Sequence, residues 1–115
     1  MAADQDLSVY MTKNESNKNT HWRIIDIGNN EVWLQNEGTT FFLHNPGKNY
    51  GTGNDITTWD TGLGNGWKIF PVGMNSDQIY LESVMGGFLY RDFGVILSDK
   101  DDSGRNWIVK VIKSK

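Results

Sequence analysis

One pattern occurs three times along this chain: a polar run, then a tryptophan, then a short strand of alternating character. The three stretches read "NTHWRIIDI" (residues 19–27), "GNGWKIFPV" (residues 64–72) and "GRNWIVKVI" (residues 104–112). Alternation of apolar and polar residues indicates a half-buried β-strand, and recurrence with a period of roughly 40 residues indicates a repeat architecture. The fold must therefore accommodate several copies of one small unit.

A hairpin precedes each of the last two copies. The stretches "EVWLQNEGTTFFLHN" and "QIYLESVMGGFLYRD" align, with a small-residue turn in the middle of each. Each hairpin is followed by a loop, a third strand, a polar loop and the tryptophan strand. Two four-strand units follow from this order, the second unit at residues 27–72 and the third unit at residues 73–115. Residues 1–26 resemble only the second half of such a unit, so we expect one domain, residues 1–115, with about 2.5 repeats.

The composition favours an all-β fold with no substantial helix. Thirteen glycines and many Asn, Asp, Ser and Thr residues supply turns, and no long stretch has helical periodicity. The predicted strands cover residues 7–12, 22–27, 31–35, 41–44, 56–59, 67–72, 78–83, 88–90, 95–98 and 107–112.

Four-strand units that each close on a tryptophan strand resemble a β-trefoil. The residues that carry the resemblance are Trp22, Trp67 and Trp107, together with the aligned leucines of the two hairpins. The "IYLESVMGGFLYRD" stretch is similar to the pattern of fascin-like and amaranthin-like trefoils. The ricin-B-like subfamily carries Gln two residues before each tryptophan, and this chain does not. The resemblance therefore implies the fold, but sugar-binding residues of ricin-type lectins are not carried over.

The resemblance implies that the first and fourth strands of each unit build a six-stranded barrel, with the three tryptophans in its core. Because the opening half of the first unit is missing, at least one barrel strand has no counterpart and one edge is left open. The alternative fold is a β-propeller, whose blades have a similar period and for which Trp59-Asp60 is a "WD" pair. Propeller blades in this number would have to be assembled from several chains.

Several classes of function are disfavoured. A formal net charge of -3 argues against nucleic-acid binding, and the absence of cysteine removes thiolate metal sites. The acidic run at residues 99–104 lacks EF-hand spacing, the glycine loops precede strands and not helices, and neither His21 nor His44 belongs to a catalytic pattern. We expect no enzyme activity, no metal, no cofactor and no membrane span. The location expected is cytoplasmic, or exported without a recognisable signal peptide.

The positive prediction concerns binding, because sugar recognition uses aromatic faces for C–H groups and Asp or Asn side chains for hydroxyls. The long loop of the second unit combines both types of residue, and the end of the third unit's hairpin does so again. The alternative role for the loop aromatics is to pack the loop onto the body. The predicted carbohydrate-binding residues are Asn45, Tyr50, Asn54, Asp55, Trp59, Asp60, Tyr90 and Asp92.

The function predicted from these features is a non-enzymatic carbohydrate-binding protein, a lectin. Its partners would be glycans or glycoproteins, and it would be multivalent through its repeats or through self-association as a homo-oligomer. The alternative function is a protein-interaction module of β-trefoil type that holds a protein partner through its loops.

Overall fold

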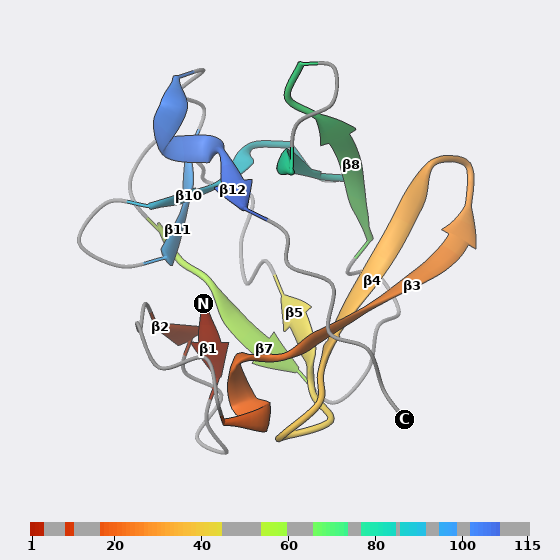
Figure 1. Cartoon of the computed structure of the whole chain (residues 1–115), viewed down its shortest axis with the longest axis vertical. Coiled ribbons are helices and arrows are strands. Elements are labelled where there is room, and N and C mark those ends of the chain that lie inside the picture. The colour runs from red at the N-terminus through yellow and green to blue at the C-terminus, as the bar shows by residue number, and fades with distance from the viewer. Residues whose placement is uncertain are drawn as a thin grey trace.

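The computed structural model describes residues 1–3, 9–10, 17–44, 54–59, 66–73, 77–84, 86–91, 95–98 and 102–108. Its strands are β1 (Ala2–Ala3), β2 (Val9–Tyr10), β3 (Trp22–Gly28), β4 (Glu31–Asn36), β5 (Phe42–His44), β6 (Asn54–Asp55), β7 (Thr57–Trp59), β8 (Trp67–Pro71), β9 (Gln78–Ser83), β10 (Phe88–Arg91), β11 (Val95–Ser98) and β12 (Trp107–Ile108). Two short 3₁₀ turns, η1 (Lys18–Thr20) and η2 (Ser103–Arg105), each lie just before a tryptophan strand (Figure 1). Within these ranges no helix is long and apolar enough to span a membrane.

Five strands lie side by side in the order β3, β4, β8, β9, β12, and all neighbours are antiparallel. In this order each tryptophan strand pairs with an opening strand. β4 pairs with β8 of its own unit and β9 with β12 of its own unit, while β3–β4 and β8–β9 join successive units. This alternation is the one expected for a barrel made from the first and fourth strands of each unit.

The second and third strands of each unit form the remaining ladders. β5 pairs with β4 and β7 in the second unit, and β10 pairs with β9 and β11 in the third. In the first unit β1 pairs with β2. β1 occupies the place of β5 and β10, so the structure adds a short second strand, Ala2–Ala3, to the half unit that the sequence predicted. Among the described residues, the opening strand of the first unit has no counterpart.

The three tryptophans make the same hydrogen bond. The indole Nε1 of Trp67 donates to the Leu43 carbonyl at 3.2 Å, and that of Trp107 donates to the Leu89 carbonyl at 3.1 Å. Trp22 donates to the Met1 carbonyl at 3.0 Å. Each bond ties the closing strand of a unit to the second strand of the same unit. It also satisfies the indole N–H, which a buried tryptophan requires.

The core lies between the barrel strands and the hairpins. Its buried members come from both complete units: Val32, Leu34, Leu43, Ile56, Trp67, Leu81, Leu89 and Val95. Leu43 and Leu89 are fully buried, as their matching places in the repeat require. Ile56 joins the units, because its backbone N–H donates to the Val95 carbonyl at 3.0 Å. The two aligned hairpins therefore contribute equivalent side chains to one shared core.

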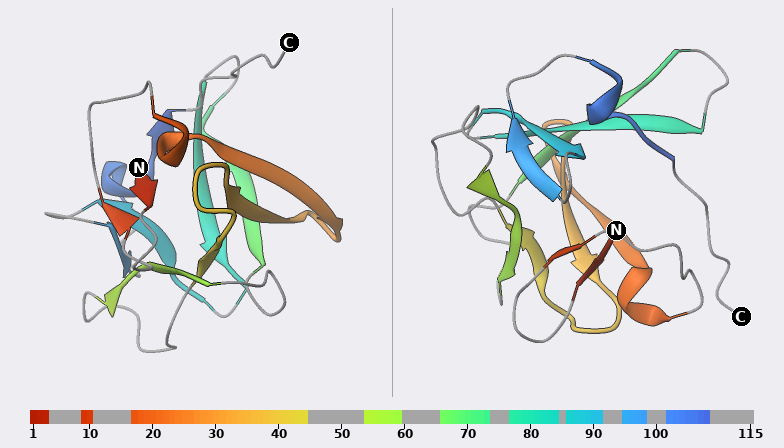
Figure 2. Two further views of the ribbon diagram at one scale, coloured as in Figure 1. Left: turned by 90° about the horizontal axis from the view of Figure 1, so that it is seen from below. Right: turned by 90° about the vertical axis from the view of Figure 1, so that its left-hand side faces the viewer.

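Local residues explain the β3–β4 hairpin, whose tip projects from the body (Figures 1 and 2). Gly28 pairs with Glu31, which leaves a two-residue turn at Asn29 and Asn30. Both asparagines have positive φ, 58° and 61°. Two positive φ angles in a two-residue loop are those of a type I′ turn, and asparagine tolerates them better than most residues. The turn closes the hairpin, and a register shift between Asp26 and Gly28 then sets the pairing of the rest of the ladder.

Asn36 holds the next turn, between β4 and β5. Its side chain is 0% exposed, and its Oδ1 accepts from the backbone N–H groups of Gly38 and Thr39, each at 3.0 Å. Its Nδ2 donates to the Asn19 carbonyl in η1 at 2.8 Å. One buried amide therefore fixes both a hairpin turn and the 3₁₀ turn that leads into β3.

The burial of the tryptophans predicts an order of stability losses. Trp67 is 1% exposed and lies between two paired strands, so Trp67→Ala should lower the free energy of unfolding by about 3–5 kcal/mol. Trp107 is only half-buried, so Trp107→Ala should cost less. Urea unfolding followed by circular dichroism measures both. An equal loss for the two variants would contradict the assignment of Trp67 as the central core residue.

The hydrogen bonds of the Asn36 side chain predict a second loss of stability. Asn36→Ala should lower the free energy of unfolding by about 2–3 kcal/mol, because it leaves buried backbone groups without partners. Asn36→Ser should cost less, because the aligned residue in the third unit is a buried serine, Ser83. Gln35→Ala is the neighbouring control and should change stability little. If Gln35→Ala cost as much as Asn36→Ala, the role given to the Asn36 amide would be wrong.

Candidate functional site

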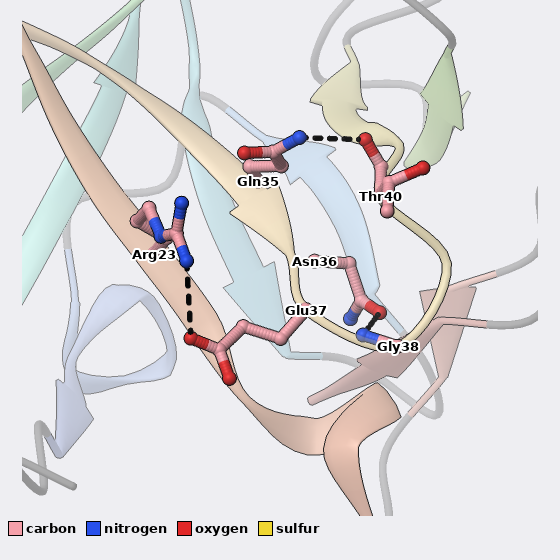
Figure 3. A network of polar contacts seen from close by, with 6 residues as sticks. All are labelled: Arg23, Gln35, Asn36, Glu37, Gly38 and Thr40. Carbon is pink, nitrogen blue, oxygen red and sulfur yellow. Dashed lines mark hydrogen bonds and ion pairs between the residues drawn. The ribbon is translucent and has the colours of Figure 1, made fainter. Parts of the chain in front are cut away.

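A polar depression lies over the junction between the first and second units. Its volume is about 370 Å³, and it is lined by Lys18, Arg23, Gln35, Asn36, Glu37 and Thr40. Figure 3 shows that Arg23 comes from β3, Gln35 and Asn36 from β4, and the others labelled there from the turn that follows. Both signs of charge therefore line one open hollow, together with amide and hydroxyl groups.

The β3–β4 register places the two central polar residues of the depression. Arg23 is the direct partner of Gln35 across the ladder. In an antiparallel pair, directly opposed residues lie on the same face of the sheet. Val32, Leu34 and Asn36 are buried, so the alternate residues of β4 face outward. Gln35 and Arg23 are thus presented on the outer surface of the barrel.

Internal contacts hold these side chains. The guanidinium of Arg23 lies 3.9 Å from the Glu37 carboxylate, with the two side chains 64% and 39% exposed. Such an exposed ion pair contributes little to stability, so both groups are available to bind a ligand. Gln35 donates from Nε2 to the Thr40 carbonyl at 3.0 Å, which fixes the amide against the turn (Figure 3). Thr40 has a positive φ of 67°, which turns the chain back into the second strand of the hairpin.

An aromatic pair borders the depression. Phe42 is opposite Gln35 in the β4–β5 ladder, so Arg23, Gln35 and Phe42 form one row across three strands. The Trp33 ring meets the Phe42 ring edge to face, with centroids 5.6 Å apart and an interplanar angle of 75°. Both residues are half-buried. The outer surface here combines hydrogen-bonding groups with partly exposed aromatic rings.

The matching place in the third unit is different. Tyr80 and Phe88 make the same edge-to-face contact, at 5.8 Å and 77°. There the guanidinium of Arg105 covers the rings, 3.8 Å from the Tyr80 centroid and 4.6 Å from that of Phe88. In the part of the chain that the structure describes, no guanidinium covers Trp33 or Phe42. The repeat thus builds two similar aromatic pairs, one under an arginine and one, next to the polar depression, that no guanidinium of the described residues covers.

The residues predicted from sequence are only partly placed. Asn45, Tyr50, Asp60 and Asp92 lie outside the described residues. Asn54 and Asp55 form β6, whose backbone pairs with β11. Their roles in binding stay predictions.

Trp59 is placed by its backbone. It is opposite Phe42 in the β5–β7 ladder. The row that begins at Arg23 and passes through Gln35 and Phe42 therefore continues to the position of Trp59. This register brings one predicted residue next to the site that the structure describes.

Tyr90 is 8% exposed, and its hydroxyl donates to Oδ1 of Asp102 at 2.7 Å. Asp102 also caps η2 by accepting from the Gly104 N–H at 2.9 Å. A Cβ at Gly104 would overlap the Tyr90 ring, so the turn needs glycine at this place. These contacts give Tyr90 a part in anchoring η2.

The alternation and repeats of the sequence do not predict the depression itself. Trp33 and Gln35 belong to the predicted strand at residues 31–35, and Arg23 belongs to the first of the three tryptophan strands; neither pattern predicts a binding surface. Trp33 and Gln35 alternate with apolar or buried residues along β4, and this alternation is the signal that places them on the outward face. The alignment of three strands that brings them together depends on register, which the repeat pattern does not reveal.

No protein-family model matches the chain, and no curated protein matches it in sequence. Among solved structures, the chain is similar to the crystal structure of a designed 3-fold symmetric protein, ThreeFoil, with a TM-score of 0.72 and 17% sequence identity. The match covers 83% of this chain and 74% of that chain. At this identity the likeness shows the fold alone: the chain has a β-trefoil-like, all-β architecture, as the repeat predicted.

Proposed function

We propose that this protein is a non-enzymatic lectin that binds glycans or glycoproteins on the outer face of the β3–β4–β5 sheet. The observation that carries the proposal is the half-buried Trp33–Phe42 pair beside the depression lined by Arg23, Gln35 and Glu37. Sugar rings present C–H groups on one face and hydroxyls at their rim. A surface that offers aromatic carbon next to charged and amide groups complements both.

The polar residues differ in what they would contribute. The Glu37 carboxylate accepts hydrogen bonds from sugar hydroxyls, and the Arg23 guanidinium donates to ring or hydroxyl oxygens. Hydrogen bonds to charged groups are about twice as strong as neutral ones, so these two residues would dominate the affinity. Gln35 is already oriented by its bond to the Thr40 carbonyl, which reduces the entropy lost on binding.

Multivalency would raise the avidity of such a shallow site. Several weak sites on one particle bind a multivalent surface far more tightly than one site does. The additional sites would come from the loop residues predicted in the second and third units, or from self-association of the chain. Trp59, opposite Phe42 in the ladder, is the residue through which the long loop of the second unit would extend the row.

A glycan array at high protein concentration, followed by calorimetry on the best glycan, tests the proposal. Trp33→Ala and Glu37→Gln should each weaken binding by about ten-fold, because each removes one type of contact to the sugar. Both side chains are at the surface or half-buried, so the fold should persist and can be checked by circular dichroism.

Glu82→Gln is the matched control, because Glu82 stands opposite Phe88 in the third unit as Gln35 stands opposite Phe42. It should leave the affinity unchanged. Absence of any glycan signal above background would refute the lectin proposal, and an equal loss from Glu82→Gln would place the site elsewhere.

A further inference from the structure

Two cations from different elements line the depression. Lys18 belongs to η1 and Arg23 to β3, and both side chains are exposed. Among the described residues that line the depression, Glu37 is the only one with a carboxylate. The whole chain carries a formal net charge of -3, so this pair of cations is a local feature and does not follow from the composition. Cations that line one hollow raise the local concentration of a negatively charged ligand.

The Arg23 guanidinium keeps its hydrogen-bonding capacity beside Glu37. Its Nη2 lies 3.9 Å from Oε1 of Glu37. A charge-assisted hydrogen bond between such groups measures about 2.7–2.9 Å, so these two attract each other without forming one. The guanidinium is planar and presents paired N–H donors that match the two oxygens of a carboxylate. A carboxylate on a ligand can therefore form the two parallel hydrogen bonds that Glu37 does not form.

The equivalent cation of the third unit already lies between carboxylates. Lys68 follows the tryptophan of its strand, as Arg23 does, and Glu82 takes the place of Gln35. Lys68 lies opposite Glu82 in one ladder and opposite Glu31 in the other. Opposite charges that face each other across a ladder attract. Arg23 instead lies opposite the neutral amide of Gln35, so an external carboxylate can take the part that Glu82 has in the third unit.

Backbone contacts hold η1 against the turn that carries Glu37. The Glu37 N–H donates to the His21 carbonyl at 2.8 Å, and Nδ2 of Asn36 donates to the Asn19 carbonyl at 2.8 Å. A Cβ at Gly38 would lie 2.7 Å from the Asn19 nitrogen, so the turn and η1 are in close contact. The two cations therefore stand on one fixed backbone junction, which reduces the ordering needed when a ligand binds both.

The cations and the aromatic pair lie within reach of one short glycan. Arg23, Gln35 and Phe42 are successive members of one row across β3, β4 and β5. Neighbouring strands lie about 4.8 Å apart, so the row spans about 10 Å. A disaccharide can therefore contact the guanidinium with one sugar and the Phe42 ring with the other.

We propose that the ligand of this depression is an acidic glycan, in which a sugar carboxylate lies between Arg23 and Lys18. This inference rests on the proposed lectin function and names the class of glycan. The carboxylate forms bidentate hydrogen bonds with Arg23 and an ion pair with Lys18. Glu37 accepts hydrogen bonds from hydroxyls of the same sugar, and the adjoining sugar contacts the Trp33–Phe42 pair.

Matched saccharides isolate the effect of the charge. Disaccharides that end in glucose and in glucuronic acid differ only where a carboxylate replaces CH₂OH, and a galactose and galacturonic acid pair repeats the comparison. A third member of each set carries a sulfate at the same carbon. On an array with the full chain at about 20 mM salt, the uronate members should bind about five-fold more tightly than the neutral members. At about 500 mM salt the preference should nearly disappear, because salt screens exposed charges.

Variants at equivalent places of the repeat locate the preference. Arg23→Gln and Lys18→Gln should each lower the ratio of uronate to neutral affinity by about two-fold or more. Lys68→Gln makes the same change of charge at the place that matches Arg23 and should keep the ratio. Gln35→Glu puts a carboxylate opposite Arg23, as Glu82 lies opposite Lys68, and should remove the preference. Because the replaced side chains are exposed or half-buried, the variants should fold, which circular dichroism checks.

The outcomes separate this inference from the lectin proposal. Binding of neutral and uronate members with equal affinity would overturn the acidic-glycan assignment and leave the lectin proposal standing. Tighter binding of the sulfates than of the uronates would overturn the choice of a carboxylate. A preference that persists in both Arg23→Gln and Lys18→Gln, or that Lys68→Gln also removes, would show that the acidic group binds elsewhere. No signal from any glycan on the array would overturn both proposals.

Discussion

The hydrogen bond from each tryptophan indole to a hairpin carbonyl is the interaction on which the three-fold arrangement depends. Trp22, Trp67 and Trp107 donate to Met1, Leu43 and Leu89 at nearly the same distances. Each bond runs from a barrel strand to the second strand of the same unit, so it couples the barrel to the hairpin of that unit. A large ring in the core with a satisfied polar group is both a packing element and a directional constraint. Because the same hydrogen bond recurs in each unit, the units have equivalent backbone positions. The side chains at these positions differ from unit to unit.

Those differences are where function can arise. The aromatic pairs Trp33–Phe42 and Tyr80–Phe88 have nearly the same geometry. In the third unit Arg105, two residues before the closing Trp107, covers the rings, whereas the matching residue of the second unit, Asn65, lies outside the described residues. Among the described residues, a guanidinium lies over the aromatic pair of the third unit and none lies over that of the second. The pseudo-symmetric scaffold keeps the backbone constant while such exchanges change the surface.

The sequence predicted the units, the strand order within them and the core role of Trp67, because these depend on local alternation and on internal similarity. It did not predict β1, since two alanines carry no strand signal and the segment is held by tertiary contacts. It did not predict the depression, because Arg23, Gln35 and Phe42 meet only through the registers of two ladders. The buried role of Asn36 was also hidden, because a polar residue at the end of a strand looks like part of a turn. The residue type of Tyr90 suggests sugar binding, but its hydrogen bond to Asp102 depends on where η2 folds back, which the local sequence does not reveal.

The depression is encoded by one continuous stretch of chain, from Lys18 to Thr40. Its residues lie on a 3₁₀ turn, a hairpin closed by the Asn29–Asn30 turn, and the turn held by Asn36. Because these contacts are close in sequence, the surface can form without assembling distant segments, and it can be copied as a block. Duplication of this stretch within a repeat protein would add a second complete copy of the surface in one genetic event. A scaffold of this kind can therefore gain copies of a surface in whole steps, without building each copy residue by residue.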